Sequence, residues 1–149
     1  MPSILTDLLE YNHIFNQKLS AQFLRDGDKS TEASLKWFNH ILNAHHIWIH
    51  RILGKTPEFN PWSVHDPAYF SDLDDENYAL SLLVLEEHGL DEIITYTNSL
   101  GKTYSNRVQD ILLHVVNHST YHRGQIAHNM RENGLEPIPS DYIMLRRQE

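Results

Sequence analysis

Residues 108–130 of the 149-residue chain read VQDILLHVVNHSTYHRGQIAHNM. Apolar side chains recur in this segment at the spacing of one face of an α-helix, and they are Val108, Ile111, Leu112, Val115, Ile126 and Met130. His118 and His122 lie on or beside that face, whereas His114 lies further round. The pattern predicts a helix that begins after a cap at Ser105 or Asn106, ends at Gly134 and turns two histidines toward a core.

Two earlier segments show the same helical spacing. Apolar residues recur at intervals of three and four through residues 4–24, which predicts a first helix there. A second pattern follows a cap at Ser30 or Thr31 and stops at Gly54. We therefore expect two long amphipathic helices in the N-terminal third of the chain.

The middle of the chain is less regular. Residues 55–73 contain several prolines and no sustained period, which predicts a long connection whose Trp62 and Phe70 pack against the helices. A third helical pattern covers residues 74–100, with a kink or break near Gly89. No segment alternates convincingly like a strand. The sequence thus predicts an all-α fold, a four-helix bundle in which helices two and three are not simple hairpin neighbours.

Composition excludes several classes of function. A length of 149 residues, with 40% hydrophobic residues, predicts one domain over residues 1–149. Twelve basic against twenty acidic residues give a net charge of −8, which argues against nucleic acid as a partner. The chain has no cysteine, so thiolate metal sites are excluded. The apolar run at residues 79–85 is too short to cross a membrane, and no signal-peptide pattern opens the chain, so we expect a soluble, cytoplasmic protein.

The eleven histidines are the most unusual feature of the composition. His118 and His122 are four residues apart, so they lie on one helix face about 6 Å from each other and can bind one ion together. Two imidazoles in an apolar interior need partners for their nitrogens, and a divalent cation would satisfy both. The pair calls for a third ligand, for which the second helix offers His40, His45, His46 and His50. Helical periodicity favours His45, with His40 at the edge of the stripe, although His45 could equally be a core histidine with a hydrogen-bond partner.

Other polar and aromatic residues have structural interpretations. The segment 123–125, Arg-Gly-Gln, could orient a ligand, but a helical glycine more often allows close helix packing, for example at a dimer contact, and we favour packing. Tyr11, Trp37 and Trp48 could line a substrate pocket, yet their positions in the apolar stripes predict core roles first.

Several motifs carry a family resemblance. They are HILNAHHIW at 40–48, LHVVNHSTYHRGQ at 113–125 and GLEP at 134–137, followed by Asp141-Tyr142 and preceded by Tyr11-Asn12 and Asn16. With these motifs the chain resembles the DinB (damage-inducible) family of the DinB/YfiT-like superfamily. The resemblance implies a four-helix bundle with a divalent-metal site made by one histidine of helix two and the pair of helix four.

The resemblance also selects the ligands. By motif position, eight residues before Trp48, the helix-two ligand is His40, so the implied set is His40, His118 and His122. Periodicity alone favours His45 instead; we adopt His40 and keep His45 in reserve. The position of His45 is usually acidic in relatives, so this chain departs from the family there.

The implied chemistry is that of a catalytic metal. Three neutral imidazoles would leave at least one open coordination position, suited to water or a thiol, on zinc, nickel or ferrous iron. Some relatives use metal to activate a low-molecular-weight thiol and others are thought to be hydrolases, so we expect a metal-dependent S-transferase or hydrolase acting on a small molecule. A non-catalytic, metal-stabilised binding or stress-response module is the alternative. The sequence identifies no catalytic residue beyond the ligands and gives weak support to a homodimer.

Overall fold

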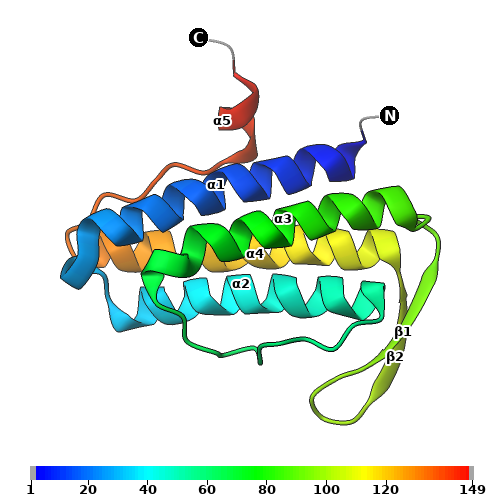
Figure 1. Ribbon diagram of the computed structural model, residues 1–149. Helices are drawn as coiled ribbons and strands as arrows, with labels where there is room; N and C mark the ends of the chain where they lie inside the picture. Colours follow the sequence, from blue (N-terminus) through cyan, green and yellow to red (C-terminus); the bar gives the residue numbers. More distant parts are fainter. Residues whose placement is uncertain (1–2, 148–149) are drawn as a thin grey trace.

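The computed structural model describes residues 3–147, and four long α-helices dominate this part of the chain (Figure 1). They are α1 (Ile4–Asp26), α2 (Glu32–Leu53), α3 (Phe70–Glu87) and α4 (Val108–Glu132). The predicted all-α bundle is confirmed. No helix within residues 3–147 combines the length and the apolar character needed to cross a membrane.

Local chemistry explains where the first two helices begin and end. The Ser3 hydroxyl accepts a hydrogen bond from the backbone N–H of Thr6 and so caps α1. Thr31, one of the two predicted caps, does the same for α2 by accepting from the N–H of Ser34. Gly54 ends α2 in the left-handed conformation, with φ of 68°, which a glycine adopts without steric cost.

The helices form a ring in which α1 packs on α3 and α4, and α2 packs on the same two helices. Helices α2 and α3 run in the same direction (Figure 1). The chain between them, residues 54–66, therefore returns along the outside of α2 before the short 3₁₀ turn Pro67–Tyr69 leads into α3. We call residues 54–66 the crossover. The expectation that helices two and three are not hairpin neighbours is confirmed.

The apolar core runs along the inside of this ring. Its fully buried large side chains include Leu9, Phe23, Phe38, Ile41, Leu42, Ile49, Phe70, Val84, Leu112, Ile126 and Met130. Phe70 is buried as predicted, and Tyr11 is 3% exposed. Trp37 and Trp48 are partly buried at the edges of the core. The three aromatic residues for which a core role was favoured thus contribute to packing.

A β-hairpin was not predicted. Strand β1 (Ile93–Thr97) pairs antiparallel with β2 (Thr103–Arg107), and Ile93 lies opposite Arg107. The prediction that the third helix extends to Leu100 was therefore wrong, whereas the predicted break near Gly89 is confirmed, because α3 ends at Glu87. Residues 93–97, Ile-Ile-Thr-Tyr-Thr, are β-branched or aromatic, and such side chains favour a strand over a helix.

Three further boundaries differ from expectation. Ser105 and Asn106 do not cap the fourth helix, because both belong to β2 and the strand leads directly into α4 at Val108. Helix α3 begins at Phe70, inside the stretch expected to be irregular. A short helix, α5 (Tyr142–Arg146), follows the extended C-terminal segment. The predicted end of the fourth helix was close, since Gly134 has a positive φ of 74° just beyond it.

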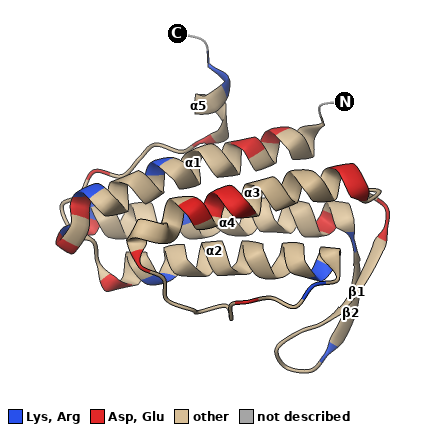
Figure 2. Ribbon diagram, in the orientation of Figure 1, with Lys and Arg blue, Asp and Glu red and all other residues tan. Residues whose placement is uncertain are grey.

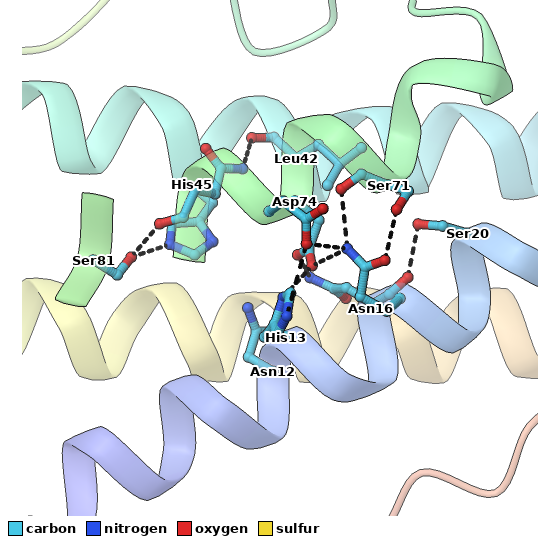
Figure 3. A network of polar contacts seen from close by, with 12 residues as sticks. Asn12, His13, Asn16, Ser20, Leu42, His45, Ser71, Asp74 and Ser81 are labelled. Carbon is cyan, nitrogen blue, oxygen red and sulfur yellow. Dashed lines mark hydrogen bonds and ion pairs between the residues drawn. The ribbon is translucent and has the colours of Figure 1, made fainter. Parts of the chain in front are cut away.

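A buried carboxylate joins α1 to α3 (Figure 3). Asp74, only 1% exposed, accepts hydrogen bonds from Nδ1 of His13 at 2.7 Å, from Asn16 at 3.0 Å and from Gln17 at 2.9 Å. The hydrogen bond from His13 to Asp74 raises the pKa of that imidazole. Three donors from one face of α1 therefore satisfy one carboxylate of α3.

Asparagine side chains of α1 also form hydrogen bonds with α4. The guanidinium of Arg123, 4% exposed, donates to the side-chain oxygens of Asn12 at 2.8 Å and Asn16 at 2.9 Å. The Asn16 amide thus accepts from Arg123 and donates to Asp74, which links two buried opposite charges through one neutral side chain. We call this chain of hydrogen bonds, from Arg123 through Asn16 to Asp74, the buried polar relay, and it connects α4, α1 and α3.

His45 lies in the middle of the core, 3% exposed (Figure 3). The Ser81 hydroxyl donates to the carbonyl oxygen of Asn77, so Nε2 of His45 carries the hydrogen of its 2.7 Å bond to Ser81. Nδ1 of His45 has no partner among the residues that the structure describes. Burial lowers the pKa of this imidazole to about 4.

Replacing the buried carboxylate tests the relay. We expect Asp74→Ala to lower the free energy of unfolding by about 3–5 kcal/mol, because the change leaves buried donors unpaired. Urea denaturation would measure the loss. Asp75→Ala is the matched control, since the neighbouring Asp75 side chain is 59% exposed, and we expect it to cost less than about 1 kcal/mol. Equal costs for the two variants would contradict the role given to Asp74.

The pKa of His45 predicts a pH dependence of stability. Below the ordinary value of 6.5 the unfolded chain takes up a proton at His45, whereas the folded protein does not until about pH 4. Stability should therefore fall as the pH is lowered through this window, and His45 accounts for about 3 kcal/mol of the loss. Urea midpoints measured across the window should fall less for His45→Leu than for His128→Leu, whose ring is 73% exposed. The same pH profile in both variants would refute this assignment.

Candidate metal centre

Three histidines from two helices converge at the surface between α2 and α4. Nitrogen atoms of His40, His118 and His122 all lie within 4.8 Å of one another, and each residue is partly buried. Nε2 of His40 is 3.1 Å from Nε2 of His118, and the rings of His118 and His122 are 4.5 Å apart between centroids. The sequence-predicted set is thus brought together, with two members one turn apart on α4 and the third opposite them on α2.

Two of the three rings are oriented by hydrogen bonds at their other nitrogen. Nδ1 of His40 donates to the carbonyl oxygen of Pro61 at 2.9 Å, and Nδ1 of His122 donates to Oε1 of Gln125 at 2.6 Å. Because Nδ1 carries the hydrogen in both rings, Nε2 of each presents a lone pair to the centre of the cluster. Such second partners are typical of histidines that bind metal.

The spacing of the nitrogens fits a small divalent ion. Two nitrogens 3.1 Å apart need a shared proton or a bound cation between them, because lone pairs alone repel. In a tetrahedral zinc site with Zn–N distances of about 2.0–2.1 Å, two ligand nitrogens are about 3.3 Å apart. The pair of His40 and His118 is therefore close to ligand geometry.

Burial keeps the imidazoles of His40 and His118 neutral near pH 7. Burial, together with the neighbouring His122 and His40, lowers the pKa of His118 to about 3. Burial also lowers the pKa of His40, against the opposing effect of the Pro61 carbonyl. Neutral imidazole is the form that binds metal, so near pH 7 a metal ion would compete with few protons for the nitrogens of His40 and His118.

The crossover supplies the outer wall of the cluster. The indole of Trp62 stacks on the ring of His40, with centroids 4.1 Å apart and planes at 12°. Trp62 remains 50% exposed and covers His40 of α2, so the prediction that it packs against the helices is confirmed. With the Pro61 carbonyl on its Nδ1 and the indole on its face, the His40 ring is fixed by two adjacent residues of the crossover.

Polar side chains of α2 hold the crossover in place. Asn39 accepts from the backbone N–H of His65, and Asn43 donates to the carbonyl of Ser63. Nε2 of His46 accepts from the backbone N–H of Glu58 at 3.0 Å, so this histidine is engaged in loop binding. Burial and the neighbouring His50 lower the pKa of His46 to about 4, which keeps that acceptor unprotonated near neutral pH.

The remaining candidates from helix two lie apart from the cluster. His45, kept in reserve, points into the core toward Ser81, so the core interpretation describes its position. His50 donates to the backbone carbonyl of His46 one turn earlier. On α4, His114 lies outside the three-histidine group and packs against the ring of Trp48, with centroids 5.3 Å apart.

The Arg-Gly-Gln segment divides into three different environments. Arg123 is buried in the relay to α1, whereas Gln125 holds His122. Gly124 is exposed, and a Cβ added there would meet nothing within 4 Å. No helix within residues 3–147 packs closely on Gly124, and a dimer contact at this exposed position stays a prediction.

A second group of possible ligand atoms comprises His13, Asp74 and Asp75. The Asp74 oxygens already accept three hydrogen bonds from α1, and His13 is stacked on Tyr78 with centroids 4.2 Å apart. These atoms are used to join helices, so the group is better explained by packing than by metal binding.

Sequence reasoning did not find the residues that orient the ligands. Pro61 and Trp62 lie in a segment without period, 21 or 22 residues after His40, and nothing in the spacing indicates which loop atoms face that ring. Gln125 had a usable signal, because it is three residues after His122 on the same helix.

Comparison with known proteins identifies the family. Residues 12–149 match the family model described as "DinB family". The chain is also 37% identical over 67 residues to Protein DinB of Bacillus subtilis (strain 168). That alignment covers 45% of this chain and 38% of the relative, so the similarity spans well under half of the relative's length. Because the family match extends over nearly the whole chain, this protein belongs to the DinB family.

Proposed function

We propose that His40, His118 and His122 bind a divalent metal ion and that the protein is a metal-dependent enzyme for a small-molecule substrate. The observation that carries the proposal is the convergence of three imidazoles, two of which have Nδ1 bonded outward and Nε2 turned inward. The reaction class we favour is thiol-dependent S-transfer or hydrolysis.

The nature of the ligands supports a catalytic site. Three protein ligands with a free fourth position are typical of catalytic zinc, whereas structural zinc sites have four. A divalent ion in such a set lowers the pKa of bound water or of a bound thiol and so supplies a nucleophile near neutral pH. Zinc, nickel and ferrous iron all suit imidazole nitrogen, and the ligand set does not select among them.

The surrounding residues would orient and shield rather than transfer protons. Gln125 and the Pro61 carbonyl hold the two rings to which they are bonded, so Nε2 of each ring stays turned toward the cluster. Trp62 covers one side of His40 and excludes water there. The substrate would therefore approach past the exposed edge of the indole.

A non-catalytic, metal-stabilised module is the second candidate. The observation that favours it is that the ligands come from both α2 and α4, so an ion would also cross-link two helices. In that case the ion would contribute mainly to stability. A homodimer and a cytoplasmic location remain predictions.

Metal content tests the ligand set. We expect His118→Ala to lose stoichiometric zinc, because the variant keeps only two of the three nitrogens. Elemental analysis of untagged protein after dialysis against a zinc buffer would measure this. His128→Ala is the control, since His128 is also on α4 but is 73% exposed and pairs with Glu132. Equal zinc content in the two variants would eliminate the site.

An open coordination position is tested separately with cobalt(II) as a spectroscopic probe. We expect the addition of 2-mercaptoethanol to the cobalt-loaded protein to produce a sulfur-to-cobalt charge-transfer band, because a thiolate fills the free position. Thermal unfolding with and without metal is the companion measurement. A large rise in melting temperature without any thiol band would support the non-catalytic module instead.

A further inference from the structure

A groove lies at the end of the bundle between the last turn of α2, the crossover and strand β1. Its volume is about 440 Å³, and its lining includes the basic residues Arg51 and Lys55 together with His50, Pro61 and residues 95–99. None of the lining residues is an aspartate or a glutamate. This is a cationic groove in a protein whose net charge is −8.

The charge distribution of the whole molecule makes the groove stand out. Figure 2 shows basic positions at the C-terminal end of α2 and at the start of the crossover, whereas acidic positions are spread over the four long helices and a later part of the crossover. Arg107, the other arginine near this end, is compensated by Asp110 at 3.0 Å and Asp91 at 3.7 Å. Arg51 differs, because it forms no ion pair or side-chain hydrogen bond within residues 3–147.

Two aromatic rings hold the Arg51 guanidinium in place. Its central carbon lies 4.5 Å from the ring centre of Trp48 and 4.8 Å from that of Tyr96. Cation–π contacts occupy the face of the guanidinium and leave its N–H donors free at the edge. The side chain is therefore ordered by contacts that do not use its hydrogen-bonding capacity.

The environment of this charge lacks a counter-ion. Burial lowers the pKa of Arg51, and Tyr96 compensates only in part. A partly buried guanidinium without an ion-pair partner is unfavourable in the free protein. An incoming anion would provide that partner and remove part of this free-energy cost. Lys55 lies four residues after Arg51, in the crossover. It is exposed and adds a second positive charge to the lining of the same groove.

We propose that Arg51, assisted by Lys55, binds a carboxylate or phosphate group of a small molecule in this groove. A planar guanidinium with a free edge can donate two parallel hydrogen bonds to either group, which a point charge does not do. Both anions share the oxygen spacing that this donor recognises. Trp48 and Tyr96 act as positioning residues for the arginine.

The groove is continuous with the wall of the candidate metal centre. Pro61 lines the groove and also accepts the hydrogen bond from His40. Arg51 is eleven residues after His40 on α2, which corresponds to about 16 Å along the helix axis. We therefore assign the anion to the far end of the substrate whose reacting group meets His40, His118 and His122. This assignment rests on the proposed function, whereas anion binding by Arg51 does not.

Anion binding is tested on metal-free protein. Glutarate and inorganic phosphate would be titrated in separate arms at constant ionic strength, with sodium chloride as the balancing salt. The readout is NMR of the Arg51 Nε–H and the Trp48 indole N–H, because the guanidinium carbon lies 4.5 Å from the centre of the Trp48 ring. We expect saturable shifts with one of the two anions at millimolar concentration, and the stronger arm identifies the carboxylate or the phosphate.

Variants connect the binding to Arg51. Arg51→Met keeps an apolar side chain against Trp48 and should weaken binding about tenfold or more, and Arg51→Lys should bind with intermediate strength. Arg25→Met is the control for loss of one charge, because Arg25 is 71% exposed on α1; it should bind like the wild type. Unchanged binding in Arg51→Met, or shifts in the wild type that do not saturate, would overturn the proposal.

A second titration tests the connection to the metal centre. Zinc-loaded protein would be titrated with ω-mercaptoalkanoates of increasing chain length and with the uncharged ω-mercaptoalkanols of the same lengths. Only the longer acids should bind more tightly than their alcohols, and Arg51→Met should abolish that difference. Equal affinities of acid and alcohol at every length would overturn the assignment to the substrate. Failure of zinc or thiols to bind would instead count against the proposed function and would leave the metal-free titration unaffected.

Discussion

Helices α2 and α3 point in the same direction, so the chain between them must travel back along the bundle. Residues 54–66 do so in contact with α2, because Asn39, Asn43 and His46 provide hydrogen bonds for their backbone. As a result, a carbonyl and an indole ring reach the histidine of α2 from outside the bundle. The candidate metal centre and the cationic groove both use this segment as a wall. Connectivity thus determines where the functional surface lies.

The buried polar relay constrains the same surface from inside. Arg123 follows His122 directly on α4, and its guanidinium is bonded to two asparagines of α1. These directional bonds, both donated by one guanidinium nitrogen, restrict the rotation of α4 about its axis. Because successive residues on a helix are about 100° apart, holding Arg123 inward keeps His122 turned toward α2. Core polarity and site geometry are therefore coupled through adjacent positions of one helix.

Much of this architecture could be predicted from sequence, and the failures have physical causes. The helical stripes predicted the four helices, and Thr31 and Gly54 marked two of their ends, because caps and periodicity are local properties. Periodicity favoured His45 over His40, since it reports burial and His45 is indeed buried; the family motif directed attention to His40. The β-hairpin was missed because its two strands are five residues long and pair only with each other, so the alternating pattern is too short to recognise. The loop atoms that hold His40 depend on the path of a segment without any period.

The histidines of the cluster differ in how far apart they lie along the chain. His118 and His122 become neighbours as soon as one turn of α4 forms, whereas His40 is 78 residues from His118 and joins them only when α2 docks. A metal ion that binds at the proposed site would therefore meet His118 and His122 as a pair before the tertiary structure is complete. Docking of α2 would then add the third ligand of the proposed site, so the formation of this site depends on tertiary assembly as well as on one local turn of α4.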